Sequence, residues 1–253
     1  KLQARRVIDA RLHELHAGRD GLSVGVRVPA AKELGVHEDA GRGGVGGGAG
    51  AGSYEPAHRQ VVAVEPSALM LSQRPGNAAP AIRGVAESLP FRDGSSDAVM
   101  ASLTMHHWSN WRAGVREMQR VTRGRIVVFT FDPLRTREYW LVQEYLPAIA
   151  DSPTEAFDLA EVAAAIGGRI EIVPVPVDCT DGFLAAYWRR PAMYLDPGRR
   201  GAVSAFHSVP PEQLHEGIAR LETDIASGEW ERRHGAGLPA DDFDAGYRLI
   251  VRD

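Results

Sequence analysis

The chain has 253 residues, a formal net charge of −4 and a hydrophobic fraction of 44%, a composition typical of a soluble globular protein with one large domain or one domain and an appendage. The acidic balance argues against a nucleic-acid partner, and the single cysteine, Cys179, excludes an intramolecular disulfide and a zinc site built from several cysteines. No apolar run reaches the roughly 20 residues that span a bilayer. Charged residues throughout 1–20 argue against a signal peptide, so we expect a cytoplasmic protein with no membrane partner.

The predicted elements alternate between strands and helices along most of the chain. Residues 1–40 show little pattern and are expected to form helix and loop. Short apolar runs bounded by turn residues predict strands at 61–64, 81–82, 97–103, 125–131, 169–177 and 247–251. Apolar residues at helical spacing, with capping residues before them, predict helices at 68–73, 109–123, 152–166 and 211–227. This order predicts an α/β protein with a largely parallel sheet.

Single residues set several expected boundaries. Ser67 can cap the first helix after the strand, and the sequence Ser-Pro-Thr-Glu at 152–155 is a capping box for the third. Gly167 is expected to end that helix. Pro174 and Pro176 interrupt the strand at 169–177, so its later half should lie at an edge or outside the sheet.

The spacing of the elements suggests four segments. They are an N-terminal helical segment (1–40), a ligand-binding α/β core (41–177), a helical insertion (178–245) and the last strand of the core sheet (246–253). The insertion is too long for a plain connection and contains helical patterns, so we expect it to form a lid over one end of the sheet.

A glycine-rich run precedes the first strand. Eight of the chain's 27 glycines fall in Gly41–Gly52. The run contains G-x-G-x-G and also a match to the dinucleotide fingerprint G-x-G-x-x-A, and Glu65 follows at the distance expected for an acid that binds ribose hydroxyls. Glycine spacing alone does not separate a nicotinamide cofactor from another adenosyl ligand, and a flexible low-complexity loop is a further alternative.

Three ordered segments carry a more specific resemblance. VVAVEPSALML (61–71), GVAESLPFRDGSSDAVMASLTMHHW (84–108) and REMQRVTRGRIVVFTF (116–131) resemble the class I S-adenosylmethionine-dependent methyltransferases, in particular the small-molecule enzymes of bacteria. The resemblance implies a Rossmann-like, seven-stranded, mostly parallel sheet whose last strand is antiparallel, with helices on both faces and a helical lid before that strand. It also implies S-adenosyl-L-methionine as cofactor, a small-molecule methyl acceptor as partner, and methyl transfer by in-line displacement.

The resemblance also places the cofactor residues. Gly48, Gly50 and Gly52 would form the loop against the methionine part, Glu65 would bind the ribose hydroxyls and Met70 would pack near the adenine. The remaining cofactor contacts fall on the adenine edge and beside the transferred methyl group: Ala86, Glu87, Leu103 and Thr104. Val85 stands where many relatives have an Asp, which removes one adenine contact.

His106 and His107 are the candidate catalytic residues, because an imidazole titrates near neutrality and can act as a general base. Adjacent side chains diverge on a helical connection, so we expect only one of the two rings to face the cofactor. The same histidines could instead only shape the pocket. Aromatic side chains are expected to line the acceptor pocket, or simply to form core: Tyr54, Trp108, Tyr187 and Trp188. No metal site is expected.

The first glycine motif departs from the family pattern. Gly46 stands where the family has an acid at the end of a β-branched strand, which predicts weakened cofactor binding. The alternatives are therefore a non-catalytic, methyltransferase-like binding or scaffold protein, a nicotinamide-dependent oxidoreductase, or a reading-frame change ahead of Gly48 that leaves the downstream site intact. The sequence does not identify the acceptor or the oligomeric state, for which a homodimer is one alternative.

Overall fold

The computed structural model describes residues 61–151, 157–179, 182–201, 203–239 and 241–253. They divide into two compact units. The sheet unit contains the described residues up to Thr130, those of 154–171, and 248–253; the helical unit contains 131–153 and 172–247. Each unit is described by itself.

Four strands form the main sheet, in the order β3-β4-β8-β5. They are β3 (Ser96–Ser102), β4 (Thr122–Phe131), β5 (Arg169–Ile172) and β8 (Tyr247–Arg252). β3 and β4 are parallel, with Val99 opposite Ile126 and Ser102 opposite Phe129. A separate parallel pair is formed by β1 (Ala63–Glu65) and β2 (Ala81–Arg83). The predicted alternation of helices with parallel strands is confirmed for these elements.

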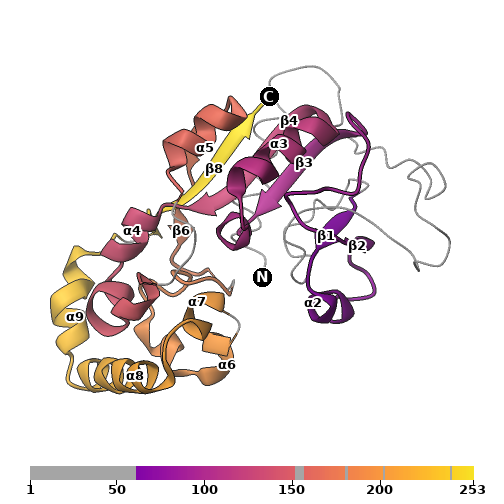
Figure 1. The fold of residues 1–253 in the computed structure, drawn as a ribbon. Coiled ribbons are helices and arrows are strands. Elements are labelled where there is room, and N and C mark those ends of the chain that lie inside the picture. Colours follow the sequence, from indigo (N-terminus) through magenta and orange to yellow (C-terminus); the bar gives the residue numbers. More distant parts are fainter. Residues whose placement is uncertain (1–60, 152–156, 180–181, 202, 240) are drawn as a thin grey trace. The chain divides into compact units, whose positions relative to one another are not determined.

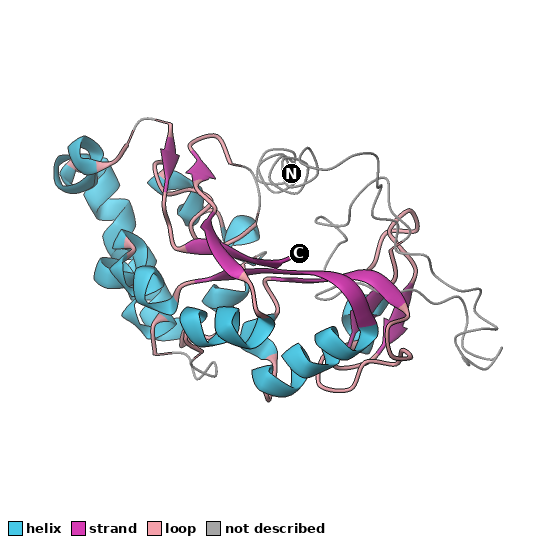
Figure 2. Cartoon of the chain, turned by 90° about the horizontal axis from the view of Figure 1, so that it is seen from above, coloured by secondary structure: helices cyan, strands magenta, loops and turns pink. Residues whose placement is uncertain are grey.

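Two helices pack on one face of the main sheet, α3 (Trp111–Val121) and α5 (Leu159–Ile166) (Figure 2). Asn110 caps α3 by accepting a hydrogen bond from the amide of Ala113 (3.0 Å). The apolar stripe of α3 joins α5 and the strands in one buried cluster: Ala101, Met105, Trp108, Trp111, Val115, Met118, Ile126, Val128, Phe157, Val162, Ala163, Ile166 and Ile250. The predicted core face of α3 is confirmed. The helical segment expected at 1–40 lies outside the described residues.

The helix expected over 152–166 begins later among the described residues, and the expected capping box at 152–155 lies outside them. The helix begins at Leu159, and the carboxylate of Asp158 accepts a hydrogen bond from the amide of Glu161 (2.9 Å). Asp158 and Glu161 repeat the same capping pattern nearer to the apolar residues that α5 buries, so burial selects this start. Gly167 ends the helix with a left-handed backbone (φ 73°), as predicted.

The proline-containing strand divides as predicted. Its first half, β5, is an edge strand of the main sheet, whereas Val175–Pro176 form β6, which pairs antiparallel with β7 (Asp242–Phe243) in the helical unit. Proline lacks the amide hydrogen that a continuing ladder needs, which explains the break.

The helical unit consists largely of short helices (Figure 1), and aromatic side chains are buried among its residues. Its helices are α4 (Pro133–Glu138), the π-helix η3 (Leu141–Tyr145), η4 (Pro147–Ile149), η5 (Pro191–Leu195), α6 (Pro197–Gly201), α7 (Ser204–His207), α8 (Pro211–Ala226), α9 (Glu229–His234) and η6 (Gly235–Gly237). Trp140 packs edge-on against Tyr194 and Trp230, and its indole N–H donates to the carbonyl of Trp188 (2.9 Å). No described helix is both long and apolar enough to cross a membrane.

Residues 131–153 join this unit although the sequence suggested an insertion at 178–245 only. Tyr139 and Trp140 lie in that earlier segment, and the Tyr139 hydroxyl is 2.9 Å from the hydroxyl of Tyr194. These contacts join residues about 50 positions apart, so no local pattern indicates them.

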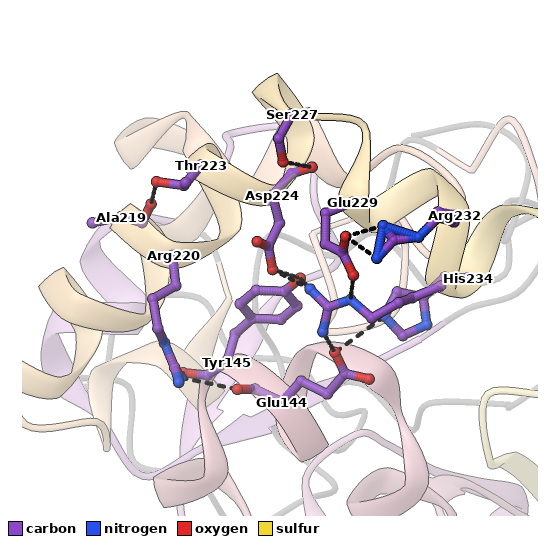
Figure 3. A network of polar contacts seen from close by, with 11 residues as sticks. Glu144, Tyr145, Ala219, Arg220, Thr223, Asp224, Ser227, Glu229, Arg232 and His234 are labelled. Carbon is purple, nitrogen blue, oxygen red and sulfur yellow. Dashed lines mark hydrogen bonds and ion pairs between the residues drawn. The ribbon is translucent and has the colours of Figure 1, made fainter.

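A polar network ties η3, α8 and α9 together (Figure 3). The guanidinium of Arg233 contacts the carboxylates of Glu144, Asp224 and Glu229. It also donates to the hydroxyl of Tyr145 (3.1 Å), which itself donates to Asp224 (2.8 Å). One guanidinium group thus links carboxylates from three separate elements.

Candidate functional site

A buried carboxylate lies at the carboxyl end of β1. Val62, Ala63 and Val64 are buried, and Glu65 follows them with 9% of its surface exposed. Its Oε1 accepts a hydrogen bond from the amide of Ser67 (2.9 Å), and no other described residue donates to this carboxylate. Ser67 in turn caps α2 (Ala68–Ser72) as predicted, by accepting from the amide of Met70 (3.2 Å). Among the described residues, the Glu65 side chain is therefore held through Oε1, and Oε2 has no donor.

Two histidines lie near Glu65, on the 3₁₀ helix η2 (Met105–His107). Burial lowers the pKa of His107, and the charge of Glu65 partly opposes that shift. Burial, with His107 as a second cause, lowers the pKa of His106 to about 4. Both imidazoles are therefore neutral near pH 7, the form that accepts a proton.

The expected divergence of the two rings is wrong. The ring centroids of His106 and His107 lie 3.9 Å apart with a 46° interplanar angle. Adjacent residues of a 3₁₀ turn lie about 120° apart around the axis, so the two side chains meet by bending toward each other and not because of the backbone winding. The two rings are therefore in direct contact and lie on the same side of η2.

A strained residue connects β3 to these histidines. Leu103 adopts a left-handed backbone (φ 47°) and donates its amide hydrogen to the carbonyl of Phe129 (2.8 Å). This conformation costs a residue with a side chain about 1–2 kcal/mol. Thr104 then precedes η2 as its N-cap residue. The chain thus turns sharply where parallel strands expose ligand sites, and sequence reasoning gave no sign of the left-handed turn.

The segment after β2 carries two further predicted cofactor residues. Ala86 packs against the buried cluster of the sheet unit. The Glu87 carboxylate accepts hydrogen bonds from the Ser109 hydroxyl (3.0 Å) and the Asn110 amide (3.1 Å). Burial acts to raise the pKa of Glu87, but these hydrogen bonds outweigh it and the pKa falls. Ser109 and Asn110 were not predicted as partners of Glu87.

Met70 and Trp108 occupy different surroundings. Met70 is 39% exposed on α2. Trp108 is 8% exposed and belongs to the buried cluster, where its ring lies over Gly114 of α3. The structure thus places Trp108 in the core of the sheet unit, and its predicted contact with an acceptor stays a prediction.

Tyr187 and Trp188 belong to the helical unit. Trp188 is fully buried, and its indole N–H donates to the carbonyl of Val175 (2.9 Å). Tyr187 is also buried, with the guanidinium carbons of Arg190 and Arg199 at 5.3 and 5.6 Å from its ring centre. Four predicted site residues lie outside the described residues: Gly48, Gly50, Gly52 and Tyr54.

The helical unit also contains a cavity that sequence reasoning did not predict. It has a volume of about 320 Å³ and is lined by polar groups of η3, α8 and α9, including Tyr145, Arg220 and Asp224. Arg220 donates to the carbonyls of Glu144 and Tyr145, and Asp224 pairs with Arg233. These polar groups are engaged in holding the helices together. Within the described part of the chain, no group of three His, Cys, Asp or Glu side chains could hold a metal ion.

Comparisons with known proteins agree with one another. A family model described as a methyltransferase domain matches residues 42–128. Curated relatives named demethylmenaquinone methyltransferase include one from Mycolicibacterium vanbaalenii, 39% identical over 98 residues (36% of this chain, 43% of the relative), and one from Beutenbergia cavernae, 39% identical over 90 residues (32% and 38%). The chain thus matches less than half the length of these relatives.

A solved structure matches almost the whole chain. It is the crystal structure of a "putative methyltransferase from antibiotic biosynthesis pathway" of Anabaena variabilis. The two are 30% identical, the alignment covers 99% of each chain, and the TM-score is 0.78.

Proposed function

Because this chain belongs to the family of class I S-adenosylmethionine-dependent methyltransferases, we propose that it transfers a methyl group from S-adenosylmethionine to a small-molecule acceptor. The observation that carries the proposal is the buried carboxylate of Glu65, oriented by Ser67 at the end of a parallel strand beside a neutral histidine pair. The family fold is a Rossmann-like α/β fold, and we further propose the seven-stranded sheet with an antiparallel last strand.

The residues around Glu65 fit the cofactor. A ribose offers two vicinal hydroxyls, and the carboxylate of Glu65 has an oxygen, Oε2, with no donor among the described residues. Among the described residues, six large apolar side chains are exposed, and three of them lie on α2 or just after β2, namely Leu69, Met70 and Val85. An adenine ring would cover such a surface. Gly48, Gly50 and Gly52 would complete the site on the methionine side.

The chemistry asks the chain for position rather than for a nucleophile of its own. S-adenosylmethionine supplies a methyl group on a positively charged sulfur, which is already a leaving group. We propose that the left-handed turn at Leu103 and Thr104 places the chain beside that methyl group and helps to exclude water. A general base is needed only where the acceptor must lose a proton, and His106 or His107 would serve, because both are neutral near pH 7; His106, with a pKa of about 4, would be the weaker base.

The acceptor is proposed by class alone. The curated relatives carry names that refer to demethylmenaquinone, and the solved structure is described as part of an antibiotic pathway. Both descriptions support a small-molecule acceptor. Contacts of the acceptor with Tyr54, Trp108, Tyr187 and Trp188 are part of this proposal, as is the helical insertion 178–245 as the acceptor-binding segment.

Calorimetric titration of S-adenosylhomocysteine into the purified protein tests the proposal. Micromolar binding is expected, and substituting Glu65→Ala should weaken it at least tenfold, because a charge-assisted pair of hydrogen bonds is lost. Glu171→Ala is the matched control, since Glu171 is also a strand acid but pairs with Arg169 (2.9 Å) at the sheet edge. If the folded protein does not bind S-adenosylhomocysteine, a non-catalytic, methyltransferase-like protein is the better interpretation. Tighter binding of a nicotinamide dinucleotide would favour an oxidoreductase.

A further inference from the structure

Two side chains of α3 bind the backbone of the loop that follows β2. Glu117 Oε2 accepts a hydrogen bond from the amide of Leu89 (2.7 Å). Arg120 donates to the carbonyl of Phe91 through Nη1 (2.7 Å) and to the carbonyl of Leu89 through Nη2 (3.0 Å). The loop has no strand partner at these positions, so α3 side chains supply the partners that a sheet would otherwise give it.

Glu117 and Arg120 also fix each other. Arg120 Nε and Nη2 donate to the two oxygens of Glu117, each at 2.7 Å, which is a two-pronged pair. Asp93 accepts from Arg120 Nη1 (2.8 Å). The pairing lowers the pKa of Glu117 and, together with Asp93, raises the pKa of Arg120, so both stay charged over the physiological range. The pair is only 19% and 31% exposed, so water competes weakly for it.

The other end of the same loop is held at the other end of the same helix. Glu87 binds the Ser109 hydroxyl and the Asn110 amide, just before α3. Ala86 lies between β2 and Glu87, and it packs against the core cluster that α3 helps to form. The segment from Ala86 to Asp93 is therefore clamped to α3 at two points.

We propose that Glu117 and Arg120 are positioning residues for the cofactor: they hold the 86–93 loop in the shape that binds the adenine edge. The inference rests on the proposed function, because the contact of Ala86 and Glu87 with adenine is part of that proposal. Neither Glu117 nor Arg120 reaches the ligand itself; each acts through the loop backbone. Loss of the clamp should therefore reduce recognition of the base more than the stability of the fold.

The test compares S-adenosylhomocysteine with S-inosylhomocysteine, in which the adenine amino group is replaced by a carbonyl. Arg120→Lys keeps the positive charge but loses the planar fork, and so loses bonds to Leu89 and Phe91. We expect this variant to bind S-adenosylhomocysteine about tenfold more weakly, with the preference for adenine over hypoxanthine reduced by a similar factor. Arg112→Lys is the matched control on the same helix, since Arg112 pairs with Glu161 of α5 and not with the loop.

The outcomes separate the inference from the proposed function. Wild-type protein that binds neither compound refutes the proposed function. Wild-type binding with an unchanged affinity and base preference in Arg120→Lys overturns the clamp, as does an equal loss in Arg112→Lys. If Arg120→Lys does not fold, Glu117→Gln replaces it; that variant keeps an acceptor for the Leu89 amide but loses the charge. Its hydrogen exchange at Leu89 should quicken together with a loss of base preference, and a preference that stays at the wild-type value overturns the proposal.

Discussion

Trp108 lies directly over Gly114 of α3, and this contact makes a strong prediction about packing beside the histidines. A Cβ atom on residue 114 would lie 2.5 Å from Cε3 and 2.6 Å from Cζ3 of the Trp108 ring. Ordinary carbon contacts are near 3.5–4.0 Å, so Gly114→Ala forces the ring or the helix to move by about 1 Å. The ring is buried among Met105, Trp111 and Val115, which leaves it little space.

The magnitude follows from two opposing effects. Alanine favours a helix interior over glycine by about 1 kcal/mol. Overpacking a core typically costs about 1–3 kcal/mol. Gly114→Ala should therefore change the free energy of unfolding by about 0 to 2 kcal/mol in the destabilising direction. In a Trp108→Leu background the ring atoms are gone, and the same substitution should stabilise by about 1 kcal/mol. The expected coupling between the two sites is about 1–3 kcal/mol.

Urea unfolding of the four proteins of this double-mutant cycle, followed by far-ultraviolet circular dichroism, measures the coupling. Arg116 is exposed on the same helix, so the difference between Arg116→Ala and Arg116→Gly gives the helix preference without a clash. Equal effects of Gly114→Ala in the two backgrounds would refute the packing of Trp108 on Gly114. A coupling near the expected value would support it.

Three further predictions concern charge and backbone. The pKa of His106 falls from 6.5 to about 4 on folding. The free energy of unfolding that this group contributes should therefore be fully present above pH 6.5 and decline by about 3 kcal/mol as the pH falls to 4. His106→Gln should flatten this decline when it is measured by urea unfolding. Leu103→Gly relieves a left-handed backbone, so it should destabilise less than Val99→Gly within the preceding strand β3, by about 1–2 kcal/mol of unfolding free energy; a larger loss for Leu103→Gly would contradict the strain. Arg233→Lys should lower the melting temperature more than Arg232→Lys, because among the described residues Arg233 contacts three carboxylates and Arg232 contacts one, that of Glu229; equal shifts would argue against the network.

Local pattern was sufficient for many elements of the sheet unit. The cap at Ser67, the apolar stripe of α3, the stop at Gly167 and the break at Pro174 were all predicted and are confirmed. Each depends on interactions within a few residues, or on a periodicity that directly reports a buried face. The predicted start of α5 was too early: among the described residues the helix begins at Leu159, where Asp158 caps it, and the capping box predicted at 152–155 lies outside them.

The candidate site was predictable as a set of residues rather than as a geometry. Position after a β-branched strand identified Glu65, and the strand end identified His106 and His107. The influence of Glu65 on the pKa of His107 and the close approach of the two tilted rings depend on where these side chains lie in the folded sheet unit. Glu87 was predicted to contact the ligand, and the structure shows its side chain binding the start of α3.

The alternation of strands and helices can be read from the chain, because hydrophobic periodicity is a local property of a sequence, and the family and cofactor class follow from the resemblance carried by its ordered motifs. The grouping of 131–153 with the helical unit, the clamp of α3 on the 86–93 loop and the left-handed turn at Leu103 emerge only after folding. They arise from contacts between residues about 20 to 50 positions apart. Such contacts exchange water for protein partners only when distant segments are brought together, and no short stretch of sequence records them.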